Sequence, residues 1–187
     1  MSDYPVVIGL SGRKGAGKDF AANILVEEYG FTRLAFADKL KEVAYATNMW
    51  IDYGSTTLKY EVDTQGWDVV KNEYPEVREF LQNLGVACRD FLHENVWVHP
   101  IESVIVHGSA DARYVITDVR FNNEQAMIHR LRGKLWKIVG DRYQSIDNHI
   151  SEIAHEAFMF DKILSNFTTS PEWMPMAIRK HAEEQDW

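Results

Sequence analysis

The sequence contains a single cysteine, Cys88, and no long apolar run. One thiol cannot form a disulfide within the chain, and it cannot supply a cysteine-based metal cluster. No stretch approaches the roughly 18–20 consecutive apolar residues that a membrane-spanning helix requires. The first ten residues also lack the basic segment that precedes the apolar part of a secretory signal. We therefore expect a cytoplasmic protein that has no membrane partner.

Positive charge is also scarce, with 20 Lys and Arg residues against 28 Asp and Glu and a formal net charge of -8. A surface this acidic repels polyanions, so we expect no partnership with a nucleic acid polymer. A local basic pocket can still bind a small anion such as a nucleotide. The length of 187 residues and the hydrophobic content of 45% suit a single domain with a full core.

Apolar strands alternate with amphipathic helices, which favours an α/β fold whose parallel sheet is covered on both faces. We predict strands at residues 4–10, 31–36, 114–117, 134–139 and 162–165. We predict helices at residues 18–29, 38–47, 77–92, 97–106 and 122–132, and a last helix after Ser170-Pro171. Residues 49–74 show only weak periodicity, so we expect an irregular insertion there.

A glycine-rich segment follows the first predicted strand and opens the first predicted helix. Residues 12–19 read G-R-K-G-A-G-K-D, which fits the P-loop pattern G-x-x-x-x-G-K over its first seven positions. In that motif backbone N–H groups surround the phosphates and the lysine contacts the β- and γ-phosphate oxygens. The alternative is a glycine-rich turn with a solvated lysine. We predict ATP binding by Gly12, Arg13, Lys14, Gly15, Ala16, Gly17, Lys18 and Asp19.

Two carboxylates and an arginine are candidates for the chemistry at this loop. Asp19 stands where Ser or Thr usually contacts Mg²⁺, and a carboxylate also holds this ion, directly or through water. Asp118 ends a predicted strand, as the second metal-positioning residue of P-loop enzymes does, although Asp also starts many turns. Arg120 is expected to stabilise the transferring phosphoryl group; the alternative is a surface pair with Glu124. We predict Mg²⁺ with ATP, held by Asp19 and Asp118.

The helix predicted at residues 77–92 carries a polar face opposite its apolar stripe. Its members are spaced by four, three and four residues and therefore point the same way; they are Arg78, Gln82, Gly85 and Arg89. This face suits a nucleotide-like ligand. The two guanidinium groups would hold its phosphomonoester, the amide would hydrogen-bond to its base, and the glycine would allow close approach. A solvated helix face is the alternative.

Further candidates lie outside that helix. Lys41, early in the helix at residues 38–47, either faces the acceptor phosphate or pairs with Asp38 or Glu42. Residues 140–155 are polar and are expected to form a lid that excludes water, with Arg142 as its charge. His149 and Glu152 would orient the acceptor or hinge the lid, and simple exposure is the alternative for His149.

With these residues in place, the chain resembles the bacteriophage deoxynucleoside monophosphate kinases. The resemblance lies in S-G-x-x-x-x-G-K-D at residues 11–19, A-D-K-L-K at 37–41, V-R-x-x-L-Q-x-L-G at 77–85, I-T-D-V-R-F-N-N-E at 116–124 and H-I-S-E at 149–152. The aspartate after the P-loop lysine is a variant that this family itself carries. The blocks run in the same order from the start of the chain to about residue 166.

The resemblance implies a three-layer P-loop core of the nucleoside monophosphate kinase type at residues 1–37 and 96–187. It implies an acceptor-binding helical insertion at 38–95 and a short lid. The implied partners are Mg·ATP and a deoxynucleoside monophosphate, in the host cytoplasm if the chain is viral. By position, Arg78, Arg89 and Lys41 would hold the acceptor phosphate, and Arg120 and Arg142 the transferring group. The oligomeric state stays open, with a homodimer among the expectations.

Two other functions compete with this one. The animal phosphomevalonate kinases look similar at S-G-x-x-x-x-G-K-D-F, residues 11–20, and also carry D-x-R after a strand. The blocks at residues 77–85 and 118–124 favour the nucleotide enzyme. A P-loop ATPase motor or nucleotide switch is the third candidate, although this small acidic chain shows no appended module for acting on a polymer.

Overall fold

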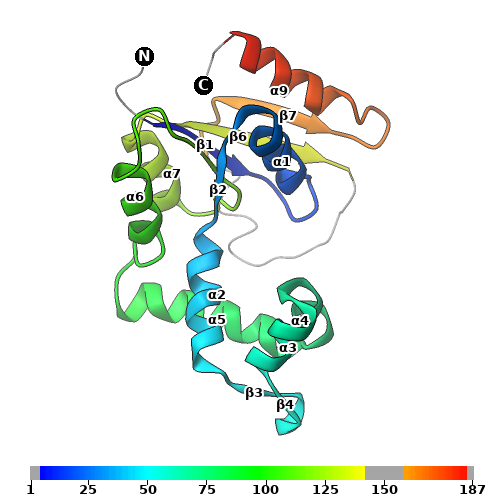
Figure 1. Cartoon of the computed structure of the whole chain (residues 1–187), viewed down its shortest axis with the longest axis vertical. Helices are drawn as coiled ribbons and strands as arrows, with labels where there is room; N and C mark the ends of the chain where they lie inside the picture. The colour runs from blue at the N-terminus through cyan, green and yellow to red at the C-terminus, as the bar shows by residue number, and fades with distance from the viewer. Residues whose placement is uncertain (1–4, 142–157, 185–187) are drawn as a thin grey trace. The chain divides into compact units, whose positions relative to one another are not determined.

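The computed structural model describes residues 5–141 and 158–184 (Figure 1). The chain divides into two compact units, one formed by Ala37–Pro100 and the other by the residues before and after that segment. The insertion expected at residues 38–95 falls within the Ala37–Pro100 unit. Most of the predicted lid, with Arg142, His149 and Glu152, lies outside the described residues.

The larger unit is built on a five-stranded sheet in the order β2-β5-β1-β6-β7, in which every pairing is parallel. Its strands are β1 (Val6–Ser11), β2 (Thr32–Leu34), β5 (Arg113–Ile116), β6 (Lys134–Gly140) and β7 (Lys162–Asn166). Ile8 of the central strand lies opposite Val115 on one side and Lys134 on the other. Because all strands run the same way, the loops after β1, β5, β6 and β7 leave one edge of the sheet.

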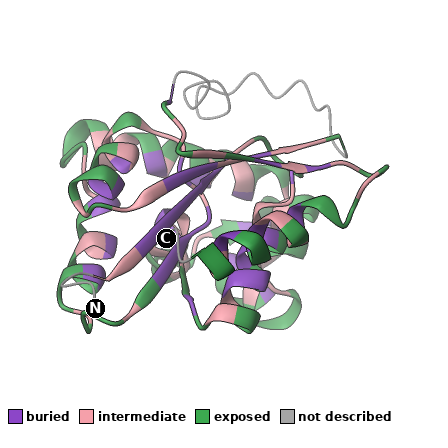
Figure 2. Cartoon of the chain, turned by 90° about the horizontal axis from the view of Figure 1, so that it is seen from above, coloured by how far each residue is buried: buried purple, intermediate pink, exposed green. Residues whose placement is uncertain are grey.

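Helices cover both faces of this sheet. The helices of the larger unit are α1 (Lys18–Tyr29), α7 (Asn122–Arg130), α9 (Trp173–Glu184) and most of α6 (Val98–Val106). On one face Leu25 of α1 and Ile178 of α9 share a buried cluster with Trp136 of the sheet. On the other face α7 lies so close to β1 that a Cβ added to Gly9 would collide with Ile128. Figure 2 shows the strands of the sheet largely buried between these layers. The predicted three-layer α/β fold is confirmed.

Phe20 and Leu92 are large apolar residues that lie at the surface. Phe20 is 47% exposed, because it lies in the first turn of α1 at the flank of the stripe that Ala21, Ala22, Ile24 and Leu25 bury. Leu92 is 71% exposed, because the helix α5 (Pro75–Phe91) ends one residue earlier and Leu92 only caps it. Among the described residues, no helix is long and apolar enough to cross a membrane.

The smaller unit has more regular structure than we predicted. Its elements are most of α2 (Phe36–Thr47), β3 (Trp50–Ile51), the 3₁₀ turn Asp52–Gly54, β4 (Thr56–Thr57), α3 (Leu58–Gln65), α4 (Trp67–Glu73) and α5 (Pro75–Phe91). The prediction of an irregular segment at 49–74 is therefore wrong. Thr57 caps α3 by accepting the N–H of Tyr60, and Gly66, with φ of 80°, ends it. Ile51, Leu58 and Val70 from this stretch are fully buried with Val77 of α5.

Candidate active site

The loop between β1 and α1, called the phosphate loop below (residues 12–19), depends on glycine at several points. Gly12, Gly15 and Gly17 have φ values of 146°, 78° and 101°. A Cβ at Gly12 would collide with the backbone of Ile138 in β6, and one at Gly17 would collide with the side chain of Asn166. The loop backbone therefore lies directly against the ends of β6 and β7, an approach that only glycine permits.

We expect Gly12→Ala to lower the free energy of unfolding by about 3–5 kcal/mol. Alanine almost never adopts this φ, and its methyl group would meet the Ile138 carbonyl oxygen. Gly30→Ala is the matched control, because Gly30 also has a positive φ of 69° but nothing lies within 4 Å of its added Cβ. The control should cost about 1 kcal/mol in urea denaturation. Equal losses for the two variants would contradict the close packing at Gly12.

Lys18 begins α1 and folds back over the loop. Its Nζ donates to the carbonyl oxygens of Gly12 at 2.8 Å and Arg13 at 3.0 Å. Gly17 precedes the helix as its N-cap and provides no side-chain cap for the first N–H groups of α1. A helix N-terminus and an ammonium group are both features that favour the binding of phosphate groups in proteins. The structure thus brings the residues predicted to bind ATP into one short loop, with Arg13 and Lys14 exposed on it.

Asp118 follows β5, which pairs directly with β1, so it leaves the same edge of the sheet as the phosphate loop. Its Oδ1 accepts the backbone N–H of Phe36 at 2.9 Å. This bond caps the first residue of α2, a structural role that the sequence did not reveal. Asp19 is exposed in the first turn of α1.

Carboxylates such as Asp19 and Asp118 are of the ligand type that Mg²⁺ prefers. Across residues 5–141 and 158–184, no group of three or more His, Cys, Asp or Glu could hold a metal ion. Mg²⁺ in phosphotransferases is held by one or two carboxylates and by the phosphate oxygens of the substrate, so a larger protein cage is unnecessary.

The turn that carries Arg120 is fixed by Glu124. Oε2 of Glu124 accepts the backbone N–H of Arg120 at 2.7 Å and of Phe121 at 3.0 Å. Glu124 is only 1% exposed, at the start of α7. Through this oxygen, Glu124 holds the backbone of the turn from which the Arg120 side chain extends. Arg120 itself is half-buried, two residues after Asp118.

In the smaller unit, the predicted polar face of α5 divides into two parts. Arg78 Nη2 donates to Asn72 Oδ1 at 3.3 Å, and Gln82 is exposed. Arg89 Nη1 instead donates to the carbonyl of Gly85 at 3.3 Å. That carbonyl also accepts the indole N–H of Trp97 at 3.1 Å, so Gly85 serves packing within the unit. Of these four residues, Gln82 is exposed, Arg78 and Arg89 are half-buried, and Gly85 is buried.

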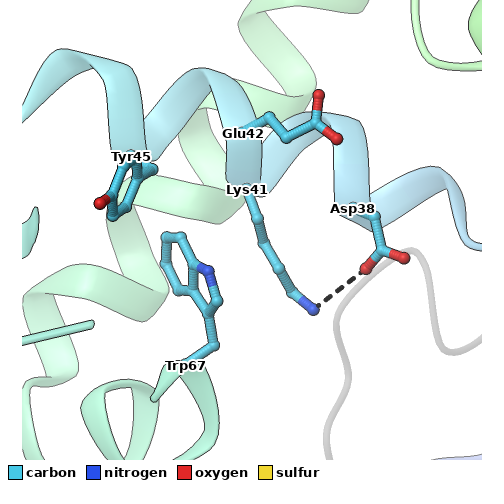
Figure 3. Close-up of a pocket in the computed structure, with 5 residues that line it drawn as sticks. All are labelled: Asp38, Lys41, Glu42, Tyr45 and Trp67. Atoms are coloured by element: carbon cyan, nitrogen blue, oxygen red, sulfur yellow. Dashed lines mark hydrogen bonds and ion pairs between the residues drawn. The ribbon is translucent and has the colours of Figure 1, made fainter. Parts of the chain in front are cut away.

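An open hollow of about 340 Å³ lies between α2 and α4 (Figure 3). Its lining residues are Asp38, Lys41, Glu42 and Tyr45 of α2 and Trp67 of α4. Lys41 Nζ lies 3.4 Å from Asp38 Oδ1. Lys41 therefore forms one of the two ion pairs that were the alternative to a contact with the acceptor phosphate. Lys41 is a predicted acceptor residue, whereas Trp67 was missed because residues 49–74 showed no usable pattern.

Charges around the hollow are set by ion pairs and hydrogen bonds. Hydrogen bonding to Lys71 lowers the pKa of Asp68, and the nearby charge of Lys41 lowers it further against the opposing effect of burial. The Tyr45 hydroxyl donates to Asp63 Oδ1 at 2.7 Å, which raises the pKa of Tyr45, as do its burial and the charge of Asp63. Tyr45 therefore stays protonated, and the influence of Lys41 reaches Asp68, the residue after Trp67 in the chain.

No protein-family model matches the chain. A curated protein of Acanthamoeba polyphaga mimivirus, named "Putative deoxynucleotide monophosphate kinase", is 32% identical over 188 residues, covering 92% of this chain and 94% of the relative. The chain belongs to the deoxynucleotide monophosphate kinase family. This membership confirms the predicted kinase class.

A solved structure confirms the fold of this kinase. A structure described as "a putative kinase" from Chloroflexus aurantiacus superposes with a TM-score of 0.53 at 16% sequence identity. The superposition covers 100% of this chain and 98% of the chain in that structure. A shikimate kinase from Aquifex aeolicus gives a TM-score of 0.46 at 11% identity, covering 97% of this chain and 98% of its own. The second likeness is too distant to carry an argument.

The structure also places beside the phosphate loop two residues that the sequence did not single out. Asn166 lies against the phosphate loop and donates to the Ala16 carbonyl at 3.0 Å. No motif marks this contact, since the two residues are 150 positions apart. Ser11, directly before the loop, is fully buried at the end of β1. Only the parallel pairing of β6 and β7 beside β1 brings such residues together.

Proposed function

We propose that this kinase transfers the γ-phosphoryl group of ATP to a deoxynucleoside 5′-monophosphate, forming ADP and the deoxynucleoside diphosphate. The observation that carries the proposal is the loop at the carboxyl end of the central strand, in which three glycines have positive φ and Lys18 folds back onto the loop backbone. The name of the mimivirus relative supports the choice of acceptor. It also favours this reaction over the phosphomevalonate and ATPase alternatives.

The phosphate loop would hold the triphosphate of ATP. Its backbone N–H groups and the N-terminus of α1 would face the β-phosphate, with Lys18 reaching the β- and γ-oxygens. Arg13 and Lys14 would offset the extra negative charge of Asp19. Asp19 and Asp118 would hold Mg²⁺, which supplies charge neutralisation between the β- and γ-phosphates when bound.

The transfer itself needs no covalent enzyme intermediate. An oxygen of the acceptor phosphate forms a bond to the γ-phosphorus, and the bond from that phosphorus to the bridging oxygen of the β-phosphate breaks, so ADP leaves with the electron pair. The protein contributes alignment of the reactants and fixed positive charge around the transferring group. We assign this charge to Lys18 and Arg120, and to Arg142 outside the described residues.

The smaller unit would bind the acceptor. Lys41 brings a cation to the hollow, and the indole of Trp67 offers a flat face on which a nucleobase stacks. Arg78 is bonded to the neutral amide of Asn72, so this contact leaves its charge available to a phosphate. Arg89, Gln82, Gly85 and Glu152 remain assigned to the acceptor by sequence alone.

We expect Arg78→Ala to raise the KM for the monophosphate about 10- to 100-fold with little change in the KM for ATP. The variant removes charge-assisted hydrogen bonds to a phosphate, each worth about 1.5–3 kcal/mol. Steady-state kinetics with each substrate varied in turn measure the effect. Glu79→Ala, an exposed neighbour on α5, is the control and should behave as wild type. An unchanged monophosphate KM in Arg78→Ala would remove Arg78 from the acceptor site.

The acceptor is tested by measuring ADP formation with a panel of deoxy- and ribonucleoside monophosphates. Phosphomevalonate and DNA are included as the acceptors or activators that the competing functions require. We expect ADP formation to depend on a deoxynucleoside monophosphate. Turnover that responds to phosphomevalonate, or to DNA without any monophosphate, would contradict the proposal.

A further inference from the structure

We propose that Asn166 is a positioning residue for nucleotide binding, whose side-chain amide orients the Gly17 N–H toward the phosphates of the bound nucleotide. The inference rests on the proposed function, because it concerns the donor site of that reaction. Asn166 is the last residue of β7, and it is far in sequence from the loop that it contacts.

The contact is buried and direct. Asn166 Nδ2 donates to the carbonyl oxygen of Ala16 at 3.0 Å. Asn166 is 4% exposed and Ala16 is 5% exposed, so water does not compete for this bond. A Cβ added to Gly17 would collide with the same Nδ2, which shows that the amide lies against the Ala16–Gly17 peptide itself.

Because the peptide is planar, this hydrogen bond also fixes the direction in which the Gly17 N–H points. In a planar trans peptide, the carbonyl of one residue and the N–H of the next point in opposite directions. Because Asn166 holds the Ala16 carbonyl toward β7, the Gly17 N–H points away from the sheet strands, into the inner side of the phosphate loop. Inward-facing N–H groups at this position are what a phosphate-binding loop requires.

Other contacts hold Asn166 and the peptide in place. Gly140, the last residue of β6, lies so close that a Cβ there would be 2.8 Å from the Ala16 carbonyl oxygen and 3.0 Å from the Asn166 carbonyl oxygen. After β7, Thr168 donates its N–H to Asp141 at 3.0 Å and its hydroxyl at 2.7 Å, which ties the exits of β6 and β7 together. The orientation of the peptide is thus set by the sheet before a ligand binds, as preorganised sites require.

Two variants of Asn166 separate this role from simple space filling. Asn166→Ala removes the amide, and Asn166→Asp keeps its shape but replaces the donor by an acceptor. Leu164→Ala is the matched control, since Leu164 is 2% exposed on the same strand and its apolar side chain has no donor for the Ala16 carbonyl. Calorimetry gives the Kd of each protein for Mg·ATP and for magnesium tripolyphosphate, and kinetics give both KM values.

We expect both Asn166 variants to bind the two ligands about tenfold more weakly, as the loss of one well-placed buried hydrogen bond predicts, with an unchanged monophosphate KM. Leu164→Ala should lower the Tm yet keep the wild-type Kd values. Wild-type affinity in folded Asn166 variants, or equal weakening in Leu164→Ala, would overturn this inference alone. A wild-type protein that binds neither ligand would overturn the proposed function together with it.

Discussion

Lys18→Met is expected to lower kcat/KM by about 1,000-fold or more while the protein stays folded. The ammonium group would neutralise charge that grows on the transferring phosphoryl group, in a reaction where such charge stabilisation supplies most of the catalysis. Lys18 bonds to the Gly12 carbonyl at a partly buried position and to the Arg13 carbonyl at an exposed one, both in its own loop. Removing these bonds should cost about 1 kcal/mol of stability or less. Steady-state kinetics and thermal unfolding measure the two effects.

The control for Lys18 is the same substitution at Lys180 on α9, whose side chain is 74% exposed beside Glu184. Lys180→Met should keep wild-type kinetics. If Lys18→Met retains activity within tenfold of wild type, the lysine is a solvated turn residue and not part of a donor site.

Asp118→Asn is expected to lower kcat by about 100-fold and to raise the Mg²⁺ concentration needed for half-maximal activity. The substitution removes the negative charge that would hold the ion, but its amide oxygen can still accept the Phe36 N–H. The Tm should therefore stay near the wild-type value. Asp118→Ala removes the charge and the cap together, so it should also lose about 1 kcal/mol of stability.

A magnesium titration of activity for wild type and both variants distinguishes the two roles of Asp118. If Asp118→Asn keeps the wild-type rate and magnesium dependence while Asp118→Ala only loses stability, Asp118 is a helix cap and has no part in the reaction.

Features that depend on short stretches of sequence were predictable. The strand β1, the phosphate loop and α1 follow one another without a break, so an apolar run, closely spaced glycines and a helical stripe identify them together. The same is true of α5, where Val77 and Leu81 repeat at helical spacing and are buried as expected. In each case the local pattern and the tertiary structure agree.

Features that depend on distant contacts were not predictable. The cap of Asp118 on α2 joins residues 82 positions apart, and no local pattern marks either partner. Residues 49–74 form elements of only two to eight residues, too short for a periodic signal to emerge. Trp67 consequently appeared as an isolated aromatic residue, although it lines the hollow beside Lys41.

The central claim concerns where the γ-phosphoryl group goes, and ATP labelled at that group tests it directly. Incubated with wild-type protein, Mg²⁺ and a deoxynucleoside monophosphate, the label should appear in the deoxynucleoside diphosphate, and Lys18→Met should abolish the transfer. Label that appears only as inorganic phosphate, at the same rate with or without the monophosphate, would contradict the account.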